Sequence, residues 1–341
     1  MPYKTGAIFN IRRHQPPLPY GPGYRGIRKP PRPIVEKSVL KNLTQTQACL
    51  TYPVLDPTHS DRQSAIHYTP LPSQMGHKNG PNGTHTMEII GHIDCREGRG
   101  AQVVMCHIDG GKQHVLAAKI YDALYYSYFD DWGPVDVTWG ADRDYSKETA
   151  AYERLHPAGL EGVPRYYGSW TFEVAVPNHP GVVRNVRMVL MEYVEGISML
   201  PLLETGEHRL FSDAERLRIM ARLMELQARM AAIGLGTIDM APRNVVLTDP
   251  KSEAWLGRGE MAVFIVDFGT ASIYDAGEPG LLPRSPLAWY PRHCPAEFES
   301  WMPEEMASGY ENEAYQEWAR GLWEGSNEFR PPSPPPEMPE S

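Results

Sequence analysis

The sequence lacks any run of about 18 apolar residues, so no membrane-spanning helix is expected. Its first residues also lack the apolar segment of a secretory signal peptide. The four cysteines form no C-x-x-C pair and have no metal-ligand spacing, so we expect reduced thiols in an intracellular protein, cytoplasmic or nuclear. The net charge of −9 argues against a nucleic acid as a partner.

Basic charge and proline are concentrated near the N-terminus. Residues 1–40 hold eight basic residues and one acid, a net +7 that leaves −16 for the rest of the chain. Residues 1–85 are rich in Pro, Gly, Asn and Ser, and the run Pro16-Pro17-Leu18-Pro19 favours an extended chain over a packed core. We therefore expect a disordered, basic, Pro-rich arm over 1–85. The alternatives are a peptide that docks an SH3-like or acidic protein partner, and a transit peptide. Residues 330–341 predict a disordered tail.

Between these ends, the pattern changes from strands to helices. Strand-like runs are predicted at 88–93, 102–108, 114–121, 169–176 and 186–191, with a hairpin turn at 109–111. A helix is predicted over 146–156, and the aromatic and acidic residues 122–145 before it have the character of an insertion. Ser212 and Glu215 form a capping-box pattern before a long apolar-faced helix that Gly234 ends. A last helix is expected over 303–324.

Two short motifs indicate chemistry. Asp239 and Asn244 lie five positions apart before an apolar run, and Asp267-Phe268-Gly269 follows a second apolar strand, 261–266. In phosphoryl transfer, one carboxylate receives the hydroxyl nucleophile, while a carboxamide and a second carboxylate hold Mg²⁺ against the phosphates. At this spacing, the pair resembles the catalytic loop and the metal-binding D-F-G of the protein-kinase family.

A lysine upstream resembles a third part of the same family. Ala117-Ala118-Lys119-Ile120 is similar to the V-A-I-K strand, whose lysine pairs with a helix glutamate and with the α- and β-phosphates of ATP. A buried ammonium needs an anionic partner, because leaving it unpaired costs on the order of several kcal/mol. Glu148 and Glu153 are the candidates. Glu148 shares the apolar stripe of the helix with Tyr152, whereas Glu153 lies on its polar face, so we choose Glu148.

Two further segments resemble nucleotide-binding parts of kinases. Residues 96–103 can be laid on G-x-G-x-x-G-x-V, with Arg and Ala at two glycine positions. Residues 189–196 resemble the hinge that joins the two kinase lobes, with Met191 at the gatekeeper position. The resemblance therefore implies a nucleotide site formed by Gly98, Val103, Lys119, Met191, Glu192, Val194, Asn244 and Asp267.

The resemblance covers residues 88–275 well and departs from the family elsewhere. Thr237 and Ile238 replace the His-Arg before the catalytic Asp, no A-P-E follows, and the usual late helices are missing. We expect an α+β, two-lobed protein kinase-like fold over 86–329. Its N-lobe, 86–194, is expected to be an antiparallel sheet, and its C-lobe, 195–329, mainly helical and truncated.

The resemblance implies an ATP- and Mg²⁺-dependent phosphotransferase that acts on a hydroxyl acceptor, preferably Ser or Thr of a protein. Lys119, held by Glu148, would anchor the phosphates, Asn244 and Asp267 would hold Mg²⁺, and Asp239 would accept the proton. Two alternatives stay open. One is a pseudokinase scaffold that binds ATP without turnover, and the other is a small-molecule phosphotransferase of the aminoglycoside-phosphotransferase type.

Overall fold

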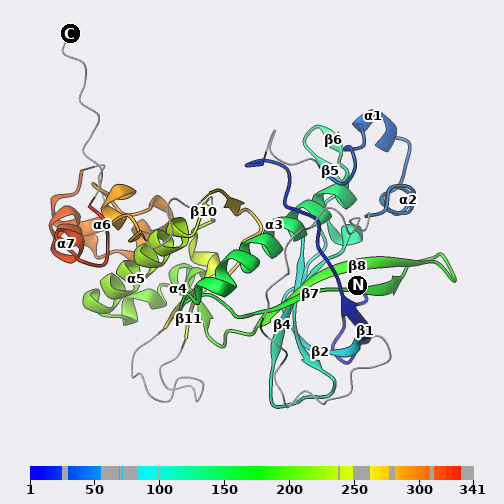
Figure 1. The fold of residues 1–341 in the computed structure, drawn as a ribbon, viewed down its shortest axis with the longest axis horizontal. Coiled ribbons are helices and arrows are strands. Elements are labelled where there is room, and N and C mark those ends of the chain that lie inside the picture. Colours follow the sequence, from blue (N-terminus) through cyan, green and yellow to red (C-terminus); the bar gives the residue numbers. More distant parts are fainter. Residues whose placement is uncertain are drawn as a thin grey trace, which may run out of the picture. The chain divides into compact units, whose positions relative to one another are not determined.

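The computed structural model describes residues 1–24, 30–54, 69, 71, 83–98, 100–236, 239–248, 262–275, 281–307 and 311–331. The chain divides into two compact units, whose ribbons are drawn in Figure 1. Unit 1 comprises Met1–Pro157, Pro164–Tyr193 and Phe268–Ser272, and unit 2 comprises Ala158–Val163, Val194–Asp267 and Ile273–Ser341. Both helices and strands occur, so the chain is of the α+β class.

Unit 1 is built on a closed antiparallel barrel. Its strands follow the order β1-β2-β3-β4-β8-β7. Alternate side chains of β3 are buried, because successive residues of a strand point to opposite faces. All five strands predicted from the sequence pattern form. A β-turn over 108–111 follows β3, with the Gly111 N–H donating to the Ile108 carbonyl at 2.9 Å and with Asp109 and Gly110 at positive φ. The barrel strands are β1 (Ile8–Arg13), β2 (Thr84–Asp94), β3 (Gln102–Ile108), β4 (Leu116–Tyr121), β7 (Tyr166–Ala175) and β8 (Val183–Glu192).

Strand β1 was not predicted, and it closes the barrel. It pairs antiparallel with both β2 and β7. Ile11 is fully buried, while Ile8 in the same strand is 66% exposed. Arg13 lies over the ring of Trp170, 3.9 Å from its centroid. The expectation of a disordered arm is therefore wrong for this strand, because the average composition of residues 1–85 concealed one short run of alternating burial.

The proline run after β1 is also packed. Pro16, Pro17 and Pro19 are buried, so this run is not free to dock an SH3-like partner. Further along, Arg32 donates two hydrogen bonds to the carboxylate of Asp136, at 2.6 and 2.7 Å. These contacts fix parts of the predicted arm to the body of unit 1.

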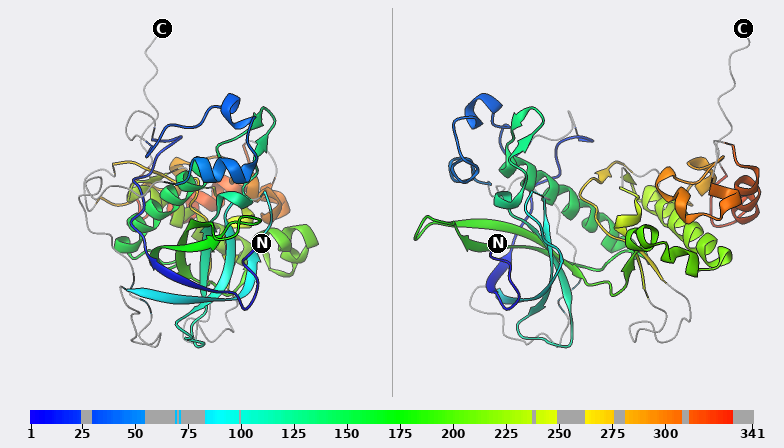
Figure 2. Two further views of the ribbon diagram at one scale, coloured as in Figure 1. Left: turned by 90° about the vertical axis from the view of Figure 1, so that its right-hand side faces the viewer. Right: turned by 180° about the vertical axis from the view of Figure 1, so that it is seen from behind.

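Two short helices of the predicted arm pack on the segment between β4 and the next long helix. Helix α1 (Lys37–Leu40) lies beside the hairpin of β5 (Phe129–Asp130) and β6 (Gly133–Pro134), as Figure 1 and Figure 2 show, and α2 (Gln45–Thr51) contacts residues 123–125. A capping box begins α2, in which Thr44 and Gln47 exchange backbone and side-chain hydrogen bonds. Leu40 and Ala48 bury their side chains in a small core shared with Val137.

Helix α3 (Val137–Ala158) is longer than the helix predicted over 146–156. The Asp136 carboxylate accepts a hydrogen bond from the Trp139 N–H at 3.0 Å, as an N-cap residue does. Residues 137–145 therefore belong to the helix, which corrects their interpretation as part of an insertion. Only residues 122–136 separate β4 from the helix, and they include the 3₁₀ turn η2 (Ala123–Tyr125).

Unit 2 contains the long predicted helix α5 (Asp213–Ala232). Its predicted capping box forms between Ser212 and Glu215. A three-stranded sheet has the order β12-β11-β9. The helix expected over 303–324 is instead two helices, because Asn312 begins a new one by accepting the Tyr315 N–H. The unit's other elements are β9 (Ile197–Ser198), α4 (Met199–Thr205), η3 (Glu207–Leu210), β10 (Leu235–Gly236), η4 (Pro242–Asn244), β11 (Val245–Leu247), β12 (Val263–Ile265), η6 (Pro286–Ala288), η7 (Ala296–Trp301), α6 (Glu304–Ala307) and α7 (Glu313–Trp323), and β13 (Ser272–Ile273) begins in unit 1.

Candidate functional site

A buried ion pair in unit 1 joins the two residues chosen from the sequence. Lys119 of β4 donates to the Glu148 carboxylate of α3 at 2.8 Å, and the side chains are 9% and 0% exposed. The same carboxylate oxygen accepts the Phe268 N–H at 3.1 Å. Both donors reach the same oxygen, Oε2, and they offset part of the cost of burying a carboxylate, which would be strongly unfavourable in isolation. Glu153, the rejected candidate, is only half-buried.

Strand register places a second predicted residue beside this lysine. Val103 of β3 lies directly opposite Lys119 of β4, and Val189 of β8 lies opposite it on the other side. Facing residues of adjacent strands have neighbouring backbone positions. The three strands therefore form one local surface around the position of the lysine.

Aromatic side chains surround the predicted gatekeeper. Tyr152 lies one helical turn after Glu148 and donates its hydroxyl to the Met191 sulfur at 3.1 Å. Its ring stacks on Tyr166 at 5.4 Å and meets the edge of Phe268 at 5.3 Å. Met191 and Phe268 are both buried. The Phe of the D-F-G motif is thus part of the core of unit 1 and is linked to the ion pair by its own N–H.

Of the two hinge residues assigned to the predicted nucleotide site, Glu192 is bonded within unit 1. The Glu192 N–H donates to the Arg165 carbonyl at 2.9 Å, and the Arg165 N–H donates back to the Glu192 carboxylate at 3.0 Å. Val194 belongs to unit 2 and is half-buried. Their contacts with a nucleotide stay a prediction.

The predicted phosphate loop, residues 96–103, is held at its described residues by side chains and backbone of unit 1. Gly98 and Gly100 have φ of 75° and 90°, a conformation that glycine adopts without strain. The buried side chain of Gln102 donates to the carbonyls of Arg96 and Gly100, at 2.9 and 3.0 Å. The Gly98 N–H donates to the Tyr125 carbonyl at 2.9 Å. These contacts hold the described residues of the loop, and the Gly98 N–H is already used.

Unit 2 brings the predicted base and a predicted metal ligand together. The Asn244 amide nitrogen donates to the backbone and side-chain oxygens of Asp239, at 2.9 and 3.0 Å. The amide nitrogen is thereby used, which leaves the amide oxygen as the group suited to a divalent cation. Arg243 also donates to both carboxylate oxygens of Asp239, at 2.9 and 2.7 Å. Thr237 and Ile238, which replace the family's His-Arg, lie outside the described residues.

The second predicted metal ligand follows the neighbouring strand. The Val266 N–H donates to the Asn244 carbonyl at 2.8 Å. Asp267 is the next residue along the chain after this contact. Asp267 has φ of 70°, a left-handed conformation that is uncommon for a residue with a side chain. Such conformations are concentrated at functional sites. Amide and carboxylate oxygens are hard ligands of the kind Mg²⁺ prefers, so Asn244 and Asp267 fit the predicted ion in chemistry.

Two contacts of the site were missed by the sequence analysis. Arg243 was noted only as part of a motif, although its opposite charge four positions after Asp239 was a signal that the two could pair. The Tyr125 carbonyl that holds Gly98 has no sequence signal, because any residue supplies a backbone oxygen. Within the described ranges, no group of three or more His, Cys, Asp or Glu could hold a metal ion, and no helix is long and apolar enough to cross a bilayer.

Comparison with known proteins gives one partial similarity. A protein of Oryza sativa subsp. japonica named "Putative cyclin-dependent kinase F-2" is 31% identical to the chain over 158 residues. The match covers 42% of this chain and 45% of the rice protein, so it spans less than half of either. No protein-family model matches the chain. The similarity suggests a kinase-like relationship, which agrees in kind with the motifs.

Proposed function

We propose that the protein is an ATP- and Mg²⁺-dependent phosphotransferase with a two-lobed, kinase-like fold. The observation that carries the proposal is the buried pair of Lys119 and Glu148, whose partners lie 29 positions apart in the sequence. A carboxylate holds the ammonium in a fixed position on a barrel strand, which makes it a preorganised cation for a polyphosphate. The partial similarity to the rice protein named as a kinase supports the same class of reaction.

Each catalytic residue has a role that its chemistry permits. Lys119 would bind the α- and β-phosphates, with Glu148 fixing its position. Asn244 and Asp267 would hold Mg²⁺, which neutralises charge on the phosphates when it is bound. Asp239 would orient the acceptor hydroxyl and accept its proton. Most of the rate enhancement would come from positioning and from electrostatic stabilisation.

The acceptor proposed is a Ser or Thr hydroxyl of a protein, and a small-molecule hydroxyl is the alternative. A second candidate function is an ATP-binding scaffold without turnover. One observation favours it, since Arg243 donates to both oxygens of Asp239 and so competes with an incoming hydroxyl. The glycine loop also departs from the family pattern, and its Gly98 N–H is already bonded.

The test is transfer of the γ-phosphate from labelled ATP to mixed protein and small-molecule acceptors. We expect Asp239→Ala to abolish transfer while MgATP binding is retained, because Asp239 acts on the acceptor and not on the nucleotide. Glu148→Gln should weaken both, since it leaves Lys119 without its counter-charge. Glu153→Gln is the matched control, because it makes the same chemical change on the same helix at a half-buried position.

Two outcomes decide between the candidates. MgATP at 100 times its Kd should stabilise the wild-type protein by about 2.7 kcal/mol. Stabilisation without transfer would favour the scaffold. Equal transfer by the wild type and Asp239→Ala would refute the role of Asp239, and no stabilisation at all would refute nucleotide binding.

A further inference from the structure

The segment between β4 and α3 is attached to the predicted phosphate loop. The Gly98 N–H donates to the Tyr125 carbonyl at 2.9 Å, and Gly98 and Tyr126 form a parallel bridge. The Tyr126 ring also lies close to Gly100, where an added Cβ would be 3.8 Å from the ring. The segment thus bonds to one glycine of the loop through its backbone and lies against the other through the Tyr126 ring.

Helix α2 is attached to this same segment by one side chain. The Gln45 amide nitrogen donates to the Ala123 carbonyl at 2.8 Å and to the Tyr126 carbonyl at 2.9 Å. A primary amide has two N–H groups, so both are used on this segment. The two bonded carbonyls flank Tyr125, whose own carbonyl holds Gly98. Gln45 therefore links helix α2 to residues 123–126 through the carbonyls of Ala123 and Tyr126. The carbonyl of Tyr125 then links those residues to the loop.

A second anchor holds the start of the segment independently of Gln45. The Asp122 carboxylate accepts two hydrogen bonds from Arg184 of β8, at 2.6 and 3.1 Å, and one from the Tyr3 hydroxyl. Asp122 is buried, and it also caps η2 through the Leu124 N–H. Since this anchor fixes residue 122, loss of Gln45 should release residues 123–126 without detaching the whole segment.

From these contacts we infer that Gln45 is a positioning residue that orders the phosphate loop through residues 123–126 and thereby tightens nucleotide binding. The inference rests on the proposed function. A loop that is already ordered loses less conformational entropy when the phosphates bind, so the affinity is higher than for a mobile loop. The N-terminal segment that composition assigned to a disordered arm would then control the nucleotide site.

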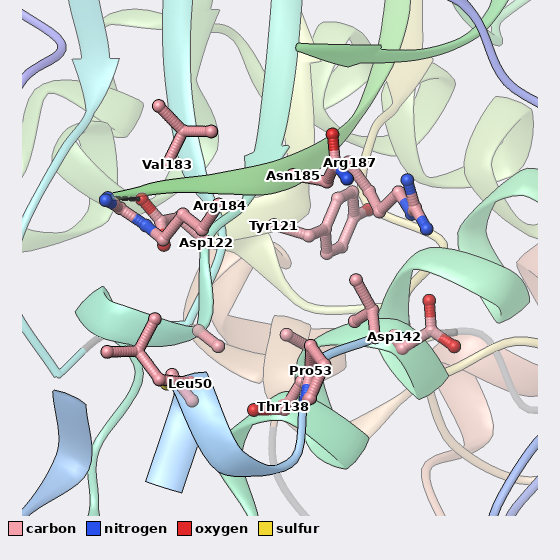
Figure 3. Close-up of a pocket in the computed structure, with 14 residues that line it drawn as sticks. Leu50, Pro53, Tyr121, Asp122, Thr138, Asp142, Val183, Arg184, Asn185 and Arg187 are labelled. Carbon is pink, nitrogen blue, oxygen red and sulfur yellow. Dashed lines mark hydrogen bonds and ion pairs between the residues drawn. The ribbon is translucent and has the colours of Figure 1, made fainter. Parts of the chain in front are cut away.

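A pocket behind α2 supplies a reporter for the docking of this helix. The pocket, drawn in Figure 3, has a volume of about 260 Å³ and lies among α2, η2, α3 and the start of β8. Cys49 of α2 lines it, and burial raises the pKa of the Cys49 thiol to about 11. A thiol with so high a pKa reacts slowly with alkylating reagents at pH 8, because the thiolate is the nucleophile. Detachment of α2 would make alkylation faster.

The experiment compares Gln45→Glu with Gln47→Glu in the full-length protein. Both variants make the same change on the same helix, but Gln47 serves the capping box, and a glutamate keeps that role. A glutamate at position 45 loses both donors. Gln45→Ala serves as a second variant without the added charge. We would measure hydrogen exchange in a peptide covering residues 95–101, the Kd for MgATP, and the rate of Cys49 alkylation.

We expect exchange in residues 95–101 to rise about tenfold or more in both Gln45 variants, because two hydrogen bonds are lost. The Kd for MgATP should rise several-fold, whereas Gln47→Glu should match the wild type. Cys49 alkylation should stay slow in all variants, since Ala48 remains in the small core.

Three results would overturn the inference. Unchanged hydrogen exchange in the loop would show that Gln45 does not order it. Faster exchange with an unchanged Kd for MgATP would show that ordering of the loop does not tighten nucleotide binding. Faster Cys49 alkylation in the Gln45 variants would trace the loop effect to detachment of α2. If the wild type binds no MgATP, the proposed function fails instead, and the exchange data still show whether Gln45 orders the loop.

Discussion

Replacing Ile11 by Ala tests whether the N-terminal strand belongs to the barrel. Ile11 is fully buried between β2 and β7, and its side chain is part of the main core of unit 1. Ile8 in the same strand is 66% exposed, so Ile8→Ala is a control with the same residue type, strand and substitution. A disordered arm would make the two variants equivalent, whereas a closed barrel makes them very different.

The expected cost follows from the atoms removed. Ile→Ala deletes three carbon atoms, and transfer of each from a buried site to water costs about 0.8 kcal/mol, or roughly 2.4 kcal/mol in total. The cavity left in a closed barrel raises the expected loss to about 2–5 kcal/mol for Ile11→Ala. The exposed Ile8 has little burial to lose, so Ile8→Ala should cost less than about 1 kcal/mol.

The assay is thermal unfolding of the full-length variants, followed by circular dichroism. At about 2–4 °C per kcal/mol for a unit of this size, Ile11→Ala should lower the Tm by roughly 5–15 °C and Ile8→Ala by at most a few degrees. Hydrogen exchange should increase in β2 and β7 of Ile11→Ala, because these strands pair with β1. Equal Tm values for the two variants would refute the closure of the barrel by β1.

Two further predictions concern single contacts. Burial by itself would raise the pKa of Asp136, but the hydrogen bonds from Arg32 and from two backbone N–H groups outweigh it and hold the pKa below its usual value. The pair therefore contributes stability above about pH 4 that is lost as the pH falls through the lowered pKa. Asp136→Ala should cost about 3–5 kcal/mol at pH 7 and progressively less in acid, as measured by urea unfolding at several pH values; a cost that does not change with pH would contradict this. Gly162 has φ of 90°, and an added Cβ would lie 2.8 Å from the Val263 carbonyl and 2.9 Å from Leu226. Gly162→Ala should therefore destabilise unit 2 by more than about 1 kcal/mol in the same assay, and an unchanged unfolding midpoint would argue against this backbone approach.

Local patterns were sufficient for the longest strands and helices of the fold. The five strands and the capped helix α5 were predictable because alternation, helical spacing and caps are short-range signals. The start of α3 was placed too late, although Asp136 and the Trp139 N–H form an ordinary cap there. The last helix was predicted as one continuous helix, but Asn312 begins a second helix within that range. Caps that lie inside aromatic and acidic stretches were hidden by composition.

The candidate site could be predicted in part from the sequence, because its residues occur in motifs with fixed spacing. The partner of Lys119 was chosen from helical periodicity, which says which face of a helix is apolar, and Glu148 lies on that face. The contacts of Gly98, Glu192 and Phe268 could not be predicted from the sequence, because they involve backbone groups that every residue carries. The roles of these residues in nucleotide binding stay predictions.

By itself, the sequence determined the order of the five predicted barrel strands and of the helix α5 after them, the positions of the motif residues, and the unequal distribution of charge along the chain. Tertiary structure alone decided that β1 joins the barrel and that Gln45 reaches the loop through residues 123–126. The physical reason is the distance along the chain that each feature involves. A hydrophobic period or a helix cap depends only on a few neighbouring residues. A strand pairing across more than 150 positions depends on which backbone edge is left open, which no local pattern records.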